Sequence, residues 1–106
     1  MEIIVEQKDH WSCMHITERL DVVTAPELEK AGKELIQKSK QIALDFSQLN
    51  YISSAGLRVL MILGKQARAN GGELVLCGFS GLVQDVLEES GVTAIFSTYD
   101  SMNSLP

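Results

Sequence analysis

Short apolar runs separated by polar turns mark the strands of this chain. Five such runs predict strands, over residues 1–7, 11–17, 42–44, 73–77 and 93–96. The first two are joined by the polar turn Lys8-Asp9-His10, which predicts a hairpin. The run 42–44 is bounded by Asp45, and a polar turn is expected to follow it.

Apolar residues at helical spacing occupy the three intervals between the later strands. The first helix is expected to begin after Thr24, its cap residue, with Pro26 in its first turn. The other two helices are expected over about 54–70 and about 79–90, and a short terminal helix can form within 97–106.

Strands and helices alternate after the first hairpin, and this order determines the fold class. Each strand–helix–strand unit calls for parallel pairing with a right-handed crossover. The sequence therefore predicts an α/β fold, in which a mixed sheet of about five strands is covered by about four helices. With 106 residues and 45% hydrophobic content, the chain is expected to form a single domain over residues 1–106.

The charge balance excludes several classes of partner. Nine basic and fourteen acidic residues give a net charge of −5, which argues against nucleic acid and anionic membranes as partners. No apolar run is long enough to cross a bilayer, and the first ten residues do not form a signal segment. We therefore expect a cytoplasmic protein.

The reactive residue types form no recognisable active site. Cys13 and Cys77 lie in strand-like runs and are expected to be buried small residues rather than a disulfide. His10 and His15 have no metal-binding spacing with them, so we expect no metal site, and His15 is interpreted as structural or solvated. Gly71-Gly72 follows a helix and precedes a strand, the reverse of a phosphate-binding loop. These observations favour a binding module over an enzyme.

Ser53 and Ser54 stand directly before an apolar helical run. The first N–H groups of a helix lack internal partners and carry partial positive charge, so a serine there can cap the helix or hold an anion. Without any other motif such a serine is most often a plain cap, and replacing Ser54 by alanine would then cost about 1 kcal/mol of stability. The residues alone leave both interpretations open.

Three separated segments of the chain resemble one protein family. They read RLDVVTAPEL, LDFSQLNYISSAGLRVL and GGELVLCGFS, and each lies at a junction between a strand and a helix. In this order they resemble the STAS domain of bacterial anti-sigma factor antagonists. The similarity extends from the first hairpin to about Tyr99, and it implies a STAS-like fold for nearly the whole chain.

The resemblance implies a phosphorylated serine and a partner surface around it. The acceptor falls on Ser54, while Ser53 stands where the family often has aspartate and Ala55 where it often has serine or threonine, so Ser53 is a rival acceptor. Glu18 replaces a frequent glycine beside the partner surface. The partner-binding residues implied in this way are Asp21, Thr24, Ser53, Ser54, Gly56, Leu57 and Arg58. Arg58 lies four residues after Ser54 and could pair with a phosphate there.

A phosphorylation switch is the function that the resemblance implies. The unphosphorylated protein would bind an anti-sigma factor that is also an ATP-dependent serine kinase, and phosphorylation on Ser54 would release it. A PP2C-type phosphatase would restore the unphosphorylated form. The kinase would hold ATP and magnesium, so this chain would need no cofactor. Two alternatives stay open: a non-phosphorylated STAS scaffold in a transporter or signalling assembly, and a module that binds a small ligand near Ser54.

Overall fold

A five-stranded sheet forms the centre of the computed structural model, which describes all 106 residues. The elements in chain order are β1 (Ile3–Lys8), β2 (Trp11–Leu20), α1 (Ala25–Lys38), β3 (Gln41–Ile52), α2 (Ser54–Ala69), β4 (Glu73–Cys77), α3 (Gly81–Glu89), α4 (Val92–Ile95), β5 (Thr98–Tyr99) and the 3-10 helix η1 (Met102–Ser104). The strands follow the order β1-β2-β3-β4-β5, with β1 antiparallel to β2 and the other pairs parallel. The predicted α/β class, mixed sheet and hairpin are confirmed.

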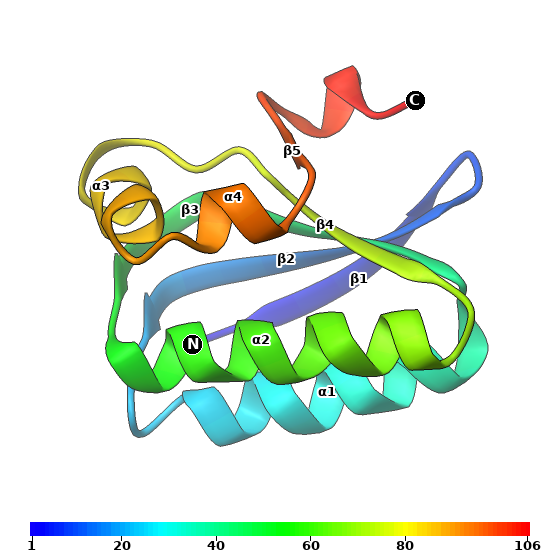
Figure 1. The fold of residues 1–106 in the computed structure, drawn as a ribbon, viewed down its shortest axis with the longest axis horizontal. Helices are drawn as coiled ribbons and strands as arrows, with labels where there is room; N and C mark the ends of the chain where they lie inside the picture. Colours follow the sequence, from blue (N-terminus) through cyan, green and yellow to red (C-terminus); the bar gives the residue numbers. More distant parts are fainter.

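The two long helices α1 and α2 lie side by side on one face of the sheet (Figure 1). Strand side chains alternate between the two faces, so Met14 and Ile16 enter the main core beneath these helices. Trp11 and Cys13 point to the opposite face, where the C-terminal segment covers them. The indole Nε1 of Trp11 donates a hydrogen bond to the carbonyl oxygen of Pro106 at 2.9 Å. Both faces of the sheet are therefore covered.

Strand β3 is longer than the sequence predicted. It continues to Ile52 instead of ending at residue 44, and Asp45 lies inside the strand rather than in a turn. The second half of the strand stays buried through Phe46, Leu49 and Ile52, while the polar residues between them face outward. The register with β2 shifts twice along this stretch, and Glu18 adopts a left-handed backbone with φ of 68° at the second shift. These irregularities explain why a simple alternation does not reveal the strand.

The predicted edge strand over 93–96 is wrong. Residues Val92–Ile95 form helix α4, and the edge strand is the two-residue β5 that follows it. Val92 and Phe96 are both buried, and their spacing of four residues suits one face of a helix. A four-residue apolar run cannot separate the two structures by periodicity alone. The expected terminal helix is the short η1.

Candidate functional site

The start of α2 is joined directly to the end of β2. The backbone N–H of Ser53 donates to the carbonyl oxygen of Leu20 at 2.9 Å. Gly56 packs over the same residue, because a Cβ at this position would lie 2.7 Å from Leu20 Cγ and 3.0 Å from its carbonyl oxygen. Only a residue without a side chain fits between this helix and the strand. The chain therefore holds the loop after β2 and the first turn of α2 next to each other.

The two serines at this junction have different environments. Ser53 occupies the N-cap position with an extended backbone, yet its hydroxyl makes no capping hydrogen bond. Its Oγ is buried and has no hydrogen-bond partner. Ser54 is the first helical residue and is exposed. The interpretation of Ser54 as a plain cap is wrong, because Ser54 lies inside the helix and not at its cap position.

An open depression of about 470 Å³ lies between the start of α2 and the loop after β2. Its lining combines two arginines, one aspartate and the serine pair, and consists of Arg19, Asp21, Val22, Tyr51, Ser53, Ser54, Ala55 and Arg58. The partial positive charge of the helix start adds to the two guanidinium groups. This depression is therefore suited to a negatively charged group.

Arg19 is held at one side of the depression by two contacts. Its guanidinium carbon lies 4.2 Å from the centre of the Tyr51 ring, and its Nε donates to Asp21 Oδ2 at 3.3 Å. Arg58 is exposed and forms no ion pair within the chain. One arginine is thus lightly tethered and the other is free.

The loop from Asp21 to Thr24 is fixed by its own polar groups. Asp21 Oδ1 accepts from the backbone N–H groups of Val23 at 3.0 Å and Thr24 at 3.1 Å. These bonds, the Thr24 one foremost, keep the pKa of Asp21 below its usual value, and the Arg19 hydrogen bond acts in the same direction. Thr24 stands at the N-cap of α1, but its hydroxyl accepts from the Asp21 N–H and donates to the Arg19 carbonyl oxygen instead of capping the helix. The predicted N-cap position of Thr24 is therefore confirmed, but its side chain makes no capping hydrogen bond.

This loop presents two apolar residues to the outside. Val22 and Val23 are 74% and 76% exposed, the highest values among the large apolar side chains exposed at the surface. Val22 lines the depression and Val23 follows it in the chain, and sequence reasoning missed both as surface residues. The sequence does carry a signal for their exposure. The two valines stand between a turn-forming aspartate and a threonine, outside the apolar repeat of the following helix.

The structure gathers part of the predicted partner surface in one place. Asp21, Ser53, Ser54 and Arg58 line the depression. Thr24 holds the adjacent loop from within, as described above. Gly56 is buried, and Leu57 is half-buried against the main core, so neither lines the depression. Gly56 positions the serines by packing, and the contact roles of these residues stay predictions.

A second polar cluster lies on the sheet face that carries the C-terminal segment. His15 Nδ1 lies 2.7 Å from Asp45 Oδ2, and His15 Nε2 lies 2.5 Å from Glu6 Oε1. Asp45 is the direct register partner of His15 in the parallel β2–β3 pair, a contact that the sequence did not reveal. Burial alone would lower the pKa of His15, but the hydrogen bonds that its protonated ring donates to Asp45 and Glu6 outweigh burial and raise the pKa. Ser47 donates to Asp45 and not to the histidine, so the cluster lacks the nucleophile–base contact of a catalytic triad.

The two cysteines are buried and free, as the sequence predicted. Burial, with Asp45 nearby, raises the pKa of Cys77 to about 12, so its reactive thiolate form is suppressed. No group of three His, Cys, Asp or Glu side chains is arranged to hold a metal ion. None of the helices combines the length and apolar character that crossing a bilayer requires.

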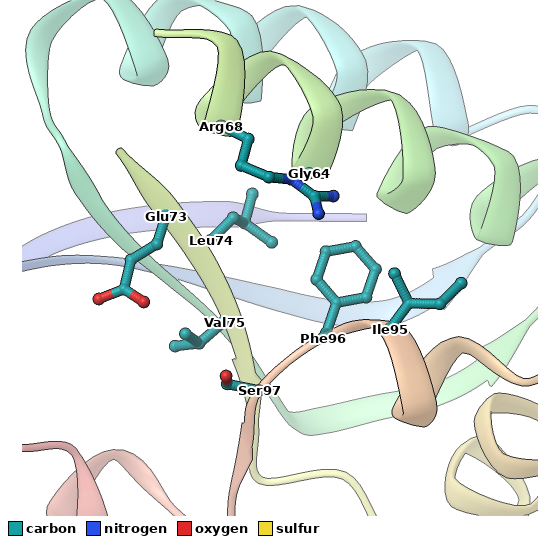
Figure 2. Close-up of a pocket in the computed structure, with 8 residues that line it drawn as sticks. All are labelled: Gly64, Arg68, Glu73, Leu74, Val75, Ile95, Phe96 and Ser97. Carbon is teal, nitrogen blue, oxygen red and sulfur yellow. The ribbon is translucent and has the colours of Figure 1, made fainter. Parts of the chain in front are cut away.

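A smaller cavity of about 140 Å³ lies between α2, β4 and α4 (Figure 2). Its wall is formed by the ring of Phe96, which packs against Gly64. Figure 2 shows the Arg68 side chain above the ring and the Glu73 carboxylate pointing away from it. The polar groups do not converge as they do in a ligand or catalytic site. The depression beside Ser54 is therefore the better candidate site.

The chain is similar to known proteins in sequence and in fold. The family model described as STAS domain matches residues 2–105. A Bordetella bronchiseptica protein described as the anti-sigma factor antagonist BtrV is 39% identical over 84 residues, which span 79% of this chain and 66% of that protein. The chain thus spans just under two thirds of this relative.

Solved structures show the same fold. A structure described as an anti-sigma factor antagonist from Thermotoga maritima has a TM-score of 0.87 at 22% identity, covering 95% of this chain and 88% of that one. The Bacillus cell fate determinant SpoIIAA in its phosphorylated form has a TM-score of 0.70 at 16% identity, covering 92% and 91%. The family match shows that the chain belongs to the STAS-domain family.

Proposed function

We propose that this protein is a phosphorylation-controlled anti-sigma factor antagonist with Ser54 as the modified residue. The observation that carries the proposal is an exposed serine at the start of α2, inside a depression lined by two arginines. Relatives described as anti-sigma factor antagonists support the role, and a solved relative is described in a phosphorylated form. Members of this family are in general binding proteins and not enzymes.

The partner we propose is an anti-sigma factor that is also a serine kinase. The Ser54 Oγ would attack the γ-phosphorus of ATP held by the kinase, losing its proton as the bond to ADP breaks. A PP2C-type phosphatase would reverse the change: water attacks the phosphorus, the bond between phosphorus and Ser54 Oγ breaks, the serine oxygen regains a proton and inorganic phosphate is released. Because the kinase depends on ATP, the proposed site of action is the cytoplasm.

Exposure favours Ser54 over Ser53 as the acceptor. A kinase must reach the hydroxyl oxygen, and the Ser53 Oγ is buried while Ser54 is exposed. A phosphate at Ser54 also projects from the first residue of α2, where the positive end of the helix dipole stabilises an anion. The fold should therefore tolerate the modification.

The same phosphate would weaken the complex with the kinase. It adds about −1.5 to −2 charges beside Val22 and Val23, the apolar residues that a partner would cover. Burying that charge in an interface carries a desolvation cost that the fold itself does not bear. We expect an affinity loss of at least about tenfold, which corresponds to roughly 1.4 kcal/mol.

The test compares affinities for the anti-sigma factor kinase of the same organism, measured by isothermal titration calorimetry. Ser54→Glu should weaken binding at least about tenfold. Ser80→Glu is the matched control, because Ser80 is also an exposed serine at a helix start and lies at the N-cap of α3. Equal affinities for wild type, Ser54→Glu and phosphorylated Ser54, with all three folded, would contradict the proposal.

A further inference from the structure

Arg19 lines the same depression as Ser54. We propose that a phosphate on Ser54 draws the Arg19 guanidinium away from Asp21, so that Arg19 and Arg58 hold the phosphate together. This inference rests on the proposed modification of Ser54 and names the residues that respond to it. Arg19 is thus a positioning residue that links the modified serine to the loop after β2.

The present contacts of Arg19 are weak enough to exchange. Only Nε bonds to Asp21, at 3.3 Å, and the terminal nitrogens make no hydrogen bond within the chain. The arginine side chain is 59% exposed, and ion pairs exposed in this way contribute little to stability. The stacking on Tyr51 keeps the guanidinium at the wall of the depression without using its donors. Two terminal nitrogens are therefore available to a new acceptor.

A phosphate is a better acceptor than the carboxylate of Asp21. It carries up to two negative charges and three acceptor oxygens, and arginine binds such groups through paired N–H donors. Arg19, Arg58 and Ser54 line the same depression, and Arg58 has no competing ion pair. Arg19 and Arg58 thus have N–H donors beside Ser54 that make no hydrogen bond within the chain.

Moving Arg19 changes the loop that carries the exposed valines. Asp21 would keep the N–H groups of Val23 and Thr24 but lose its only arginine. Its negative charge would then face outward beside Val22, next to the new phosphate. The partner surface would change at two points, of which only Ser54 is chemically modified.

The test uses protein with phosphoserine incorporated at position 54 during translation, so that no kinase is needed. The phosphate is titrated by phosphorus NMR in the Arg19→Gln and Arg58→Gln variants and in the control Arg68→Gln. Arg68 is an exposed arginine in the last turn of the same helix. An unpaired phosphoserine has a second pKa of about 6, and nearby arginines lower it. We expect each of the two variants to raise the phosphate pKa by roughly 0.3 or more, while Arg68→Gln leaves it unchanged.

A second readout follows the arginine itself. On modification, the Nε–H signal of Arg19 and the amide signals of Val23 and Thr24 should shift in the nitrogen–proton spectrum. An unchanged phosphate pKa in Arg19→Gln, or an Arg19 Nε–H signal that does not move, would overturn the inference. Failure of the proposed function would look different, since it would show as unaltered partner affinity or absent modification in cells.

Discussion

Gly56 in α2 lies so close to Leu20 in β2 that an added Cβ would be 3.0 Å from the Leu20 carbonyl oxygen. A backbone atom cannot move aside as a flexible side chain can. We expect Gly56→Ala to lower the free energy of unfolding by about 1–3 kcal/mol, despite the higher helix propensity of alanine. Urea denaturation measures the effect. Lys65→Ala, at an exposed position of the same helix, should stay within about 0.5 kcal/mol of wild type, and an equal effect of both would contradict the packing role.

Ser53→Ala tests the unpartnered hydroxyl at the helix start. If Ser53 capped the helix, alanine would cost about 1 kcal/mol. Because its Oγ is buried without a partner, we expect no loss or a gain of up to about 1 kcal/mol in the free energy of unfolding. Ser101→Ala is the control, since the Ser101 hydroxyl accepts from the Asn103 N–H and should cost stability when removed. A clear loss in Ser53→Ala would mean that the hydroxyl has a partner in solution.

Glu18 occupies a backbone conformation that suits glycine better than glutamate. Its φ of 68° is left-handed, a conformation that costs a residue with a Cβ roughly 1–2 kcal/mol. Glycine avoids this cost, but it also loses more backbone entropy on folding, which offsets part of the stabilisation. Glu18→Gly should therefore raise the free energy of unfolding by about 0.5–1 kcal/mol. Asp9→Gly, with φ of 57°, should gain less because aspartate tolerates this conformation better. Thermal melting of both variants measures these changes in stability. A lower melting temperature for Glu18→Gly than for wild type would contradict the prediction.

The Glu6–His15–Asp45 cluster predicts a specific pH dependence. The pKa of His15 is raised in the folded protein, so its stabilising contribution is complete below the unfolded value of about 6.5 and is lost as pH rises through the folded value. The stability difference between wild type and His15→Gln should therefore be larger at about pH 6 than at about pH 9. Glu6→Gln should reduce that difference without abolishing it, because Asp45 remains. Urea denaturation across this range would contradict the account if the difference were flat or grew with pH.

The sequence predicted the alternation of strands and helices because the apolar repeats of α1, α2 and α3 are regular. It missed the last part of β3, where register shifts beside Glu18 break the alternation. It also turned α4 into a strand, since a run of four apolar residues has too few positions to show a period. The apolar pattern therefore distinguishes a helix from a strand only in elements long enough to show several repeats.

The candidate site also has features that the sequence predicted and features that it did not. Ser54 was predicted because a helix start and a family resemblance both fall on the same short stretch. The Arg19–Tyr51 stacking and the His15–Asp45 pair join residues from different strands, and only the strand register shows them. The exposure of Val22 and Val23 depends on how the Asp21 loop is held, which no apolar pattern encodes. Side-chain contacts between different strands therefore could not be predicted from the sequence.

The most direct test of the central claim is the mass of the protein isolated from its own cells, followed by peptide mapping. The account predicts a fraction that is heavier by one phosphoryl group, with the group on Ser54. A phosphate found only on Ser53 would contradict the assignment that rests on exposure. Protein that stays unmodified throughout growth and stress would contradict the switch and favour the non-phosphorylated scaffold.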